Sequence, residues 1–209
     1  MNISVVLNVY KRPHSLVPQI KAIKSQTVPP KEIFIWHNFG VDLPQINDSC
    51  VTISSCSSNL GVWARFAYAL NCKSDYICIF DDDAIPGRKW FENCLNTLQS
   101  HNGLLGARGL RFKSNHQYTP NESFGWGCNN LNPEIVDIVG HSWFFHRSLL
   151  EAFWREIPCS ELPSTAGEDI HFSWAIQKFL SLKTYVPPHP PSDLELWGSL
   201  PETGNQFGR

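Results

Sequence analysis

Short hydrophobic runs alternate with amphipathic stretches over the first half of the chain. Residues 3–9, ISVVLNV, form a continuous β-branched run, which is typical of a strand buried on both faces. Pro13 then opens a stretch with apolar residues at helical spacing to about residue 26. The same patterns predict strands at 31–38, 51–55 and 74–80 and helices at 59–72 and 88–101. This alternation predicts an α/β fold with a doubly wound, mostly parallel sheet.

The pattern after residue 102 is less regular. A polar loop reaches to about residue 130 after the first predicted strand of this half. We expect strands at 103–112, 134–140 and 142–146, helices at 147–157 and 164–180, and an extended segment at 183–193. The whole chain, 1–209, is expected to be one domain. The last dozen residues, with three glycines, indicate a poorly ordered or truncated end, so the chain is expected to be the N-terminal part of a longer one.

Composition narrows the class of protein. Of the 209 residues, 42% are hydrophobic and 17% charged, as in ordinary globular domains. A net charge of −2 without a basic run disfavours a nucleic-acid polymer or an anionic membrane as the main partner. No run is long enough to span a bilayer and no signal peptide is visible, so we expect a cytoplasmic protein. Seven cysteines without a CxxC pair fit reduced thiols better than zinc or disulfides.

Three consecutive aspartates, Asp81, Asp82 and Asp83, follow the predicted strand 74–80 directly. Adjacent carboxylates repel one another unless a cation lies among them, and the carboxyl ends of parallel strands are where such sheets bind ligands. Oxygen ligands favour Mg²⁺ or Mn²⁺ over zinc, and such ions complete their coordination with water and phosphates. The triplet therefore predicts a metal site for a nucleoside diphosphate, with a solvated acidic turn as the alternative.

Other polar residues are expected on the same rim. Tyr10 and Arg12 end the first strand, Asn38 ends the second, and Arg65 lies on the following helix. An aromatic ring suits a base, an amide suits a base edge, and a guanidinium suits a phosphate. The alternatives are routine turn residues and, for Arg65, a solvent-facing helical position.

Three further polar residues are candidates in the second half. Glu168 and Asp169 begin a predicted helix, where the helix dipole alone favours acids, but either carboxylate is suited to act as a general base. His189 lies among four prolines that stiffen the segment, and it is a candidate metal or phosphate ligand or simply a surface residue.

In this order, the segments ISVVLNVYKRP, QTVPPKEIFIWHN, NLGVWARFAYAL, DYICIFDDDAIPGRKW and GED resemble the nucleotide-sugar glycosyltransferases of the GT-A fold, especially the large family-two-like inverting group. The resemblance covers about residues 3–175. Within that group the chain is similar to a small chlorella-virus domain that glycosylates a capsid glycoprotein. The resemblance implies a Rossmann-like nucleotide-binding half over about 1–100 and an acceptor half over about 101–195.

The implied activity is transfer of a hexosyl group from a UDP-sugar, such as UDP-glucose or UDP-rhamnose, to a glycan or glycoprotein hydroxyl. Mn²⁺ or Mg²⁺ would be the cofactor, and a viral enzyme would work in the host cytoplasm. The resemblance implies these roles: Val9, Tyr10, Arg12, Asn38, Arg65, Asp81 and Asp82 bind the nucleotide-sugar; Asp83, Asp81 and His189 bind the metal; Asp169, with Glu168 beside it, is the catalytic base and gives inversion; Trp126 and Trp143 stack on the acceptor or pack in the core. At Asn38 the family more often has an aspartate.

Two other functions are compatible with such a sheet. A nucleotidyltransferase acting on sugar phosphates also uses acidic metal sites, but it would need a glycine-rich basic loop after the first strand, and NVYKRPHSL contains no glycine. A catalytically inactive nucleotide-sugar or carbohydrate-binding module would keep the aspartates and bind without turnover.

Overall fold

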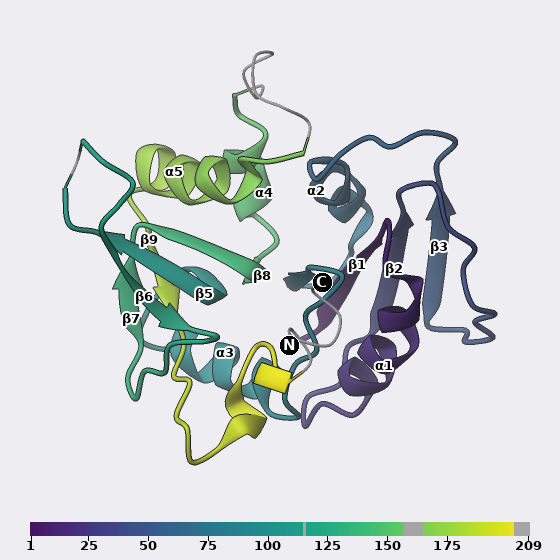
Figure 1. The fold of residues 1–209 in the computed structure, drawn as a ribbon, viewed down its shortest axis with the longest axis horizontal. Helices are drawn as coiled ribbons and strands as arrows, with labels where there is room; N and C mark the ends of the chain where they lie inside the picture. The colour runs from purple at the N-terminus through teal and green to yellow at the C-terminus, as the bar shows by residue number, and fades with distance from the viewer. Residues whose placement is uncertain (115, 157–164, 203–209) are drawn as a thin grey trace.

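A computed structural model describes residues 1–114, 116–156 and 165–202 (Figure 1). Its nine strands belong to one mixed sheet in the order β3-β2-β1-β4-β8-β5-β9-β7, with β6 paired to β5. The strands are β1 (Ile3–Val9), β2 (Glu32–His37), β3 (Val51–Ser55), β4 (Tyr76–Phe80), β5 (Gly103–Phe112), β6 (Asn121–Gly125), β7 (Glu134–Val136), β8 (Ile138–His146) and β9 (Lys183–Val186). The helices are α1 (Pro13–Lys24), α2 (Ala64–Tyr68), α3 (Trp90–Leu98), α4 (Leu149–Phe153) and α5 (Glu168–Leu180), with 3-10 turns η1 (Ala69–Asn71) and η2 (Leu194–Leu196).

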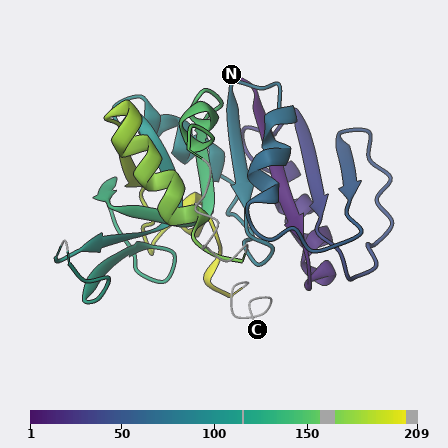
Figure 2. The ribbon, with the colours of Figure 1, turned by 90° about the horizontal axis from the view of Figure 1, so that it is seen from above.

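The first four strands form a parallel unit, as the sequence predicts. β1 lies between β2 and β4, with Val9 opposite His37 and Leu7 opposite Phe80. Alternate residues of β1 face opposite sides of the sheet. Val5 and Leu7 pack toward α1 and α3, whereas Val6 packs toward α2, α4 and α5. The fold therefore has three layers, and Figure 2 shows α2, α4 and α5 in front of the sheet.

The second half of the sheet is mainly antiparallel. β8 pairs antiparallel with both β4 and β5, whereas β9 runs parallel to β5. The two strands predicted at 134–140 and 142–146 have other limits in the structure. β7 ends at Val136, and β8 runs without a break from Ile138 to His146. β6 lies inside the predicted loop. One residue is inserted in β8 where it faces β5, because Gly106 pairs with Trp143 but Arg108 pairs with Gly140.

Several helices are shorter than their hydrophobic patterns predict. The stretch 59–72 contains only α2 and η1, because the chain before α2 takes a left-handed turn at Gly61, whose φ is +75°. α5 begins at Glu168 since Gly167, at φ +93°, departs from helical geometry. Residues 157 and 164, the expected limits of two helices, lie outside the described residues.

The C-terminal segment closes against α3. Gly198 packs so closely on Trp90 and Ala107 that a Cβ there would meet the Ala107 Cβ at 2.4 Å. Residues 203–209, part of the expected poorly ordered end, lie outside the described residues. Among the described helices, none has the length and apolar character needed to cross a membrane. The cysteines described, a set without Cys159, carry free thiols.

Candidate active site

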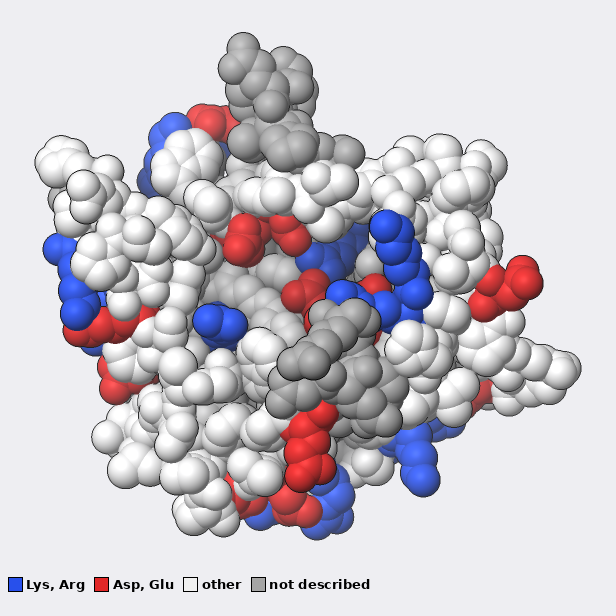
Figure 3. All heavy atoms as spheres, in the orientation of Figure 1, with Lys and Arg blue, Asp and Glu red and all other residues white. Residues whose placement is uncertain are grey.

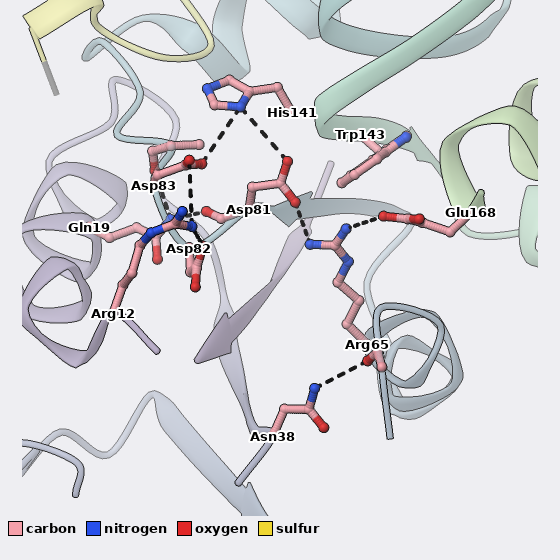
Figure 4. Close-up of polar contacts among 12 residues, drawn as sticks. Arg12, Gln19, Asn38, Arg65, Asp81, Asp82, Asp83, His141, Trp143 and Glu168 are labelled. Carbon is pink, nitrogen blue, oxygen red and sulfur yellow. Dashed lines mark hydrogen bonds and ion pairs between the residues drawn. The ribbon is translucent and has the colours of Figure 1, made fainter. Parts of the chain in front are cut away.

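The aspartate triplet lies in a turn directly after β4 and is held from two sides (Figure 4). The buried Gln19 of α1 donates from Nε2 to the carbonyl oxygens of Asp81 at 2.8 Å and Ala84 at 2.7 Å. On the other side the Asp81 N–H donates to the His141 carbonyl at 3.2 Å. Because both the first and last residues of the turn are fixed, the three carboxylates have a defined direction.

Asp81, Asp83 and His141 form a candidate metal group. One ligand atom from each lies within 4.8 Å of the others. The His141 Nδ1 is 3.8 Å from Asp81 Oδ2 and 3.7 Å from Asp83 Oδ1, which is too long for hydrogen bonds. The buried Nε2 has no hydrogen-bond partner among the described residues. Two carboxylates and an imidazole with spare capacity fit a divalent cation such as Mn²⁺ or Mg²⁺.

The position of His141 depends on the extra residue in β8. Its φ of +68° is left-handed, a conformation that costs about 1–2 kcal/mol outside glycine. Bulges of this kind re-aim a side chain, and here the ring turns toward the aspartates. Burial lowers the pKa of His141, although Asp81 and Asp83 raise it, and the lowered pKa favours the neutral imidazole that ligates metals. Sequence reasoning missed His141 because nothing in the strand pattern marks the bulge.

Arg65 compensates the charge of Asp81. It is 3% exposed and bridges two acids, with Nη1 2.5 Å from Asp81 Oδ1 and Nη2 2.7 Å from Glu168 Oε1. Its guanidinium also lies 4.7 Å from the centre of the Trp143 ring. Burial raises the pKa of Glu168, and Arg65 opposes that rise. Glu168 is thus the ion-pair partner of a buried guanidinium through Oε1, and it also lines a cavity on the β1 side of Asp81.

Trp143 packs in the core, the second of the two alternatives that the sequence left open, and its role as an acceptor platform was wrong. Its side chain is 1% exposed, packs edge-on against Phe66, and donates from Nε1 to the Val139 carbonyl at 3.1 Å. β8 lies between β4 and β5 in the sheet, and Trp143 packs on the face of the sheet that α2 and α5 cover. Its contribution to the site is indirect, through the cation–π contact with Arg65.

A cavity of about 280 Å³ lies on the β1 side of Asp81. Arg12 lines it and binds Asp82 at 2.6 Å, with Asp83 at 3.6 Å. Burial raises the pKa of Asp82, against the opposing effect of Arg12. Tyr10 also lines the cavity, whereas the Val9 side chain is buried in the core beneath it.

Asn38 and Asn8 line the same cavity in different ways. Asn38 holds the following loop, since its Oδ1 accepts from the Leu60 N–H at 2.8 Å and its Nδ2 donates to Asn59 Oδ1 at 2.8 Å. Its side chain therefore shapes the cavity wall. Asn8, which sequence reasoning missed, has a buried Oδ1 without a partner in the described part of the chain. That oxygen is an acceptor available to a ligand N–H or O–H.

A second cavity of about 270 Å³ lies on the β5 side of Asp81. Asp169 lines it, and its Oδ1 accepts from the Ile170 N–H at 2.8 Å, so Oδ2 is the oxygen left for a ligand. Burial raises the pKa of Asp169. Trp126 lines the wall and stacks on His141, with ring centres 4.3 Å apart and planes at 21°. Figure 3 shows a hollow in this face, bordered by acidic and basic side chains.

His189 does not have the role of metal ligand that the sequence predicts. It is fully buried, its Nδ1 is 2.7 Å from the Pro187 carbonyl oxygen, and its Nε2 accepts from the Gly198 N–H at 3.2 Å. The rings of Trp90 and Trp197 pack around it at 5.5 Å. Both ring nitrogens are therefore used to hold the C-terminal segment, and the histidine near the aspartates is His141.

Comparisons with known proteins agree with this geometry. A family model described as "Glycosyl transferase family 2" matches residues 4–154. The structure is similar to that of residues 1–349 of S. aureus TarS, with a TM-score of 0.63, 15% identity, and coverage of 91% of this chain and 59% of that one. The TarS complex with UDP-GlcNAc gives a TM-score of 0.60, 13% identity, and coverage of 93% and 60%.

A third similar structure is the mannosyltransferase PcManGT from Pyrobaculum calidifontis in complex with GDP-Man and Mn²⁺. Its TM-score is 0.56 at 15% identity, over 92% of this chain and 58% of that one. The chain thus spans about three fifths of these structures, and the likeness establishes a shared fold. No match is found among curated protein sequences.

Proposed function

Because the chain belongs to glycosyl transferase family 2, we propose that it transfers a sugar from a UDP-sugar to a hydroxyl group of a glycan or glycoprotein, with Mn²⁺ or Mg²⁺ as cofactor. The observation that carries this proposal is that Asp81 lines both cavities. A donor in one cavity and an acceptor in the other would meet beside Asp81, Asp83 and His141, the three residues able to hold a cation.

The cavity on the β1 side is the proposed donor site. Tyr10 borders the nucleoside, Asn8 offers an acceptor oxygen, and the wall held by Asn38 closes the base end. Arg12 stands at the diphosphate end, paired with Asp82. A bound divalent cation neutralises charge that develops on the departing diphosphate. Asp81, Asp83 and His141 would hold that cation.

The cavity on the β5 side is the proposed acceptor site, and Asp169 is the proposed base. Its Oδ2 takes the proton of the acceptor hydroxyl as the hydroxyl oxygen attacks the anomeric carbon. Attack from the side opposite the diphosphate inverts the configuration. Glu168 is paired with Arg65 through Oε1 and lines the other cavity, so Asp169 is the acid that lines the proposed acceptor site. Trp126 is the proposed platform for the acceptor sugar.

Residues of about 1–100 supply most of the proposed donor half and those of about 101–195 the acceptor half. The donor sugar is proposed to be a glucosyl or deoxyhexosyl group carried by UDP. The similar structures hold UDP-GlcNAc and GDP-Man, so both belong in a test. A viral glycoprotein acceptor stays a prediction from the resemblance, and a cytoplasmic location stays a prediction from the sequence.

A screen of nucleotide-sugars with and without Mn²⁺ tests the proposal. Release of UDP from UDP-glucose, UDP-rhamnose and UDP-GlcNAc, and of GDP from GDP-Man, is measured together with the mass of candidate acceptors. We expect metal-dependent release from one UDP-sugar, reduced about 10²–10³-fold in Asp83→Asn. The control is Asp48→Asn, which removes a carboxylate paired with Lys24 outside both cavities.

Other outcomes contradict the proposal in recognisable ways. UDP binding without turnover would indicate a binding module. Formation of a nucleotide-sugar from a nucleoside triphosphate and a sugar phosphate would indicate a nucleotidyltransferase. Turnover that ignores the metal, or an Asp83→Asn variant as active as the wild type, would remove the metal from the mechanism.

A further inference from the structure

Two arginines of β5, three residues apart, have opposite environments. Arg111 is satisfied within the fold: its guanidinium lies 2.8 Å from Glu134 and 3.5 Å from Glu122, and it donates to the Ile135 carbonyl. Arg108 is exposed, and among the described residues no carboxylate lies within 4.0 Å of it and no side-chain hydrogen bond holds it. Arg108 differs from an ordinary solvated surface arginine because it lines the cavity on the β5 side of Asp81.

Arg108 has one aromatic neighbour in place of an ion pair. Its guanidinium lies 5.8 Å from the centre of the Trp126 ring, and that ring stacks on His141. Arg108 also follows Gly106 across the irregularity that re-aims His141 on the neighbouring strand. Arg108 therefore lies on β5 directly beside the bulge that carries the candidate metal ligand.

The free guanidinium belongs to the cavity of Asp169. The wall of this cavity includes Arg108, Tyr118, Trp126, Asp169 and His141. Arg108 does not line the cavity of Tyr10 and Asn38, where Arg12 already stands at the proposed diphosphate end. Its charge is thus placed to meet the acceptor and not the nucleotide.

We propose that Arg108 binds an anionic group of the acceptor, a carboxylate or a phosphate, so that the acceptor is an acidic saccharide. A planar guanidinium binds either group through two parallel N–H···O bonds, which a neutral hexose cannot match. The inference rests on the proposed transferase function for naming the ligand an acceptor. It goes beyond that function because it selects the chemical class of the acceptor.

Calorimetric titrations of the whole chain, saturated with UDP and Mn²⁺, test the inference without requiring turnover. The probes are a disaccharide ending in a uronic acid, its neutral hexose counterpart, and a hexose phosphodiester. We expect the wild type to bind at least one acidic probe about tenfold more tightly than the neutral one. The two acidic probes distinguish a carboxylate from a phosphate. Higher salt is expected to weaken the preference.

Arg108→Gln is expected to abolish the preference, and Arg108→Lys to restore part of it. The matched control, Arg111→Gln, removes an arginine from the same strand and keeps the preference. Equal affinity of the wild type for acidic and neutral probes, including the absence of binding to either acidic probe, would overturn the inference. So would an unchanged preference in Arg108→Gln.

The UDP affinity of the Arg108 variant decides whether Arg108 contacts the acceptor or the donor. UDP affinity in the presence of Mn²⁺ is expected to stay within about twofold of wild type in Arg108→Gln, and a loss of tenfold would assign Arg108 to the diphosphate instead. The proposed function fails separately, when the wild type neither binds nor turns over any nucleotide-sugar. Repeating the titrations without UDP and Mn²⁺ keeps the binding of the acidic probes measurable in that case.

Discussion

The bulge around His141 and the proline-rich segment around His189 each hold an imidazole that is almost fully withdrawn from solvent. The His141 side chain is 11% exposed and that of His189 is in a fully buried residue. At His189 the fold supplies a carbonyl oxygen for one ring nitrogen and a backbone N–H for the other. At His141 one nitrogen faces two carboxylates beyond hydrogen-bond distance, and the other has no partner among the described residues.

The difference indicates that the polar atoms able to bind a ligand are those that have no hydrogen-bond or ion-pair partner within the fold. A buried polar atom without a partner costs stability, so its retention in a strained backbone conformation points to a function that requires it. The same contrast separates Glu168, which Arg65 holds, from Asp169, whose Oδ2 faces a cavity beside Gly140. It also separates Arg111 from Arg108 on β5.

The largest effect is expected at the two adjacent acids. Asp169→Asn should lower transfer about 10²–10³-fold with little change in UDP affinity, because it removes a proton acceptor and no structural partner. Glu168→Gln should instead lower the free energy of unfolding by about 2 kcal/mol, since Arg65 loses a charged partner. Steady-state transfer assays and urea unfolding measure the two effects.

The two acids serve as controls for each other. If Asp169→Asn transfers sugar normally, the assignment of the base is wrong. If Glu168→Gln instead abolishes transfer at unchanged stability, Glu168 is the base. The contrast between a carboxylate paired with Arg65 and one available to the acceptor would then be wrong.

A smaller effect is expected in the dependence of stability on pH. Burial lowers the pKa of His189 to about 4, whereas a histidine in an unfolded chain titrates near about 6.5. Below about pH 6.5 the unfolded chain binds a proton that the folded chain does not, so stability falls as pH falls toward 4. The loss from His189 amounts to at most about 3 kcal/mol.

Urea unfolding between pH 7.5 and 4.5 checks this effect by comparing the wild type with His189→Gln. The variant should start less stable, because it loses part of the bonding to Pro187 and Gly198, but its stability should fall less steeply with acid. Parallel profiles for the two proteins would mean that His189 does not resist protonation and that its environment is less closed than the structure indicates.

The parallel half of the fold was predictable because its signals are local. The β-branched run of β1, the proline at the start of α1 and the aspartates after β4 each predict an element or its end from a few neighbouring residues. Once strands are parallel, topology alone brings their carboxyl ends together. Tyr10, Arg12 and Asp81 therefore share a cavity, as their positions at strand ends suggest.

The remaining site residues depend on long-range contacts. His141 reaches the aspartates only because β8 inserts between β4 and β5 and carries an extra residue there. Trp143, two residues on, is buried by the same insertion. The prolines beside His189 predicted a rigid segment, but not that its ring nitrogens would be occupied. These positions depend on which strands pair and in which register, and no short stretch of sequence specifies that pairing.

The most direct test of the central claim is the Mn²⁺ affinity of the two histidine variants. Free Mn²⁺ is followed by electron paramagnetic resonance in the presence of UDP, for the wild type, His141→Gln and His189→Gln, after each variant is shown to be folded. The account predicts that His141→Gln weakens Mn²⁺ binding at least about tenfold and that His189→Gln stays within about twofold of wild type. Wild-type affinity in His141→Gln, or a loss confined to His189→Gln, would contradict it.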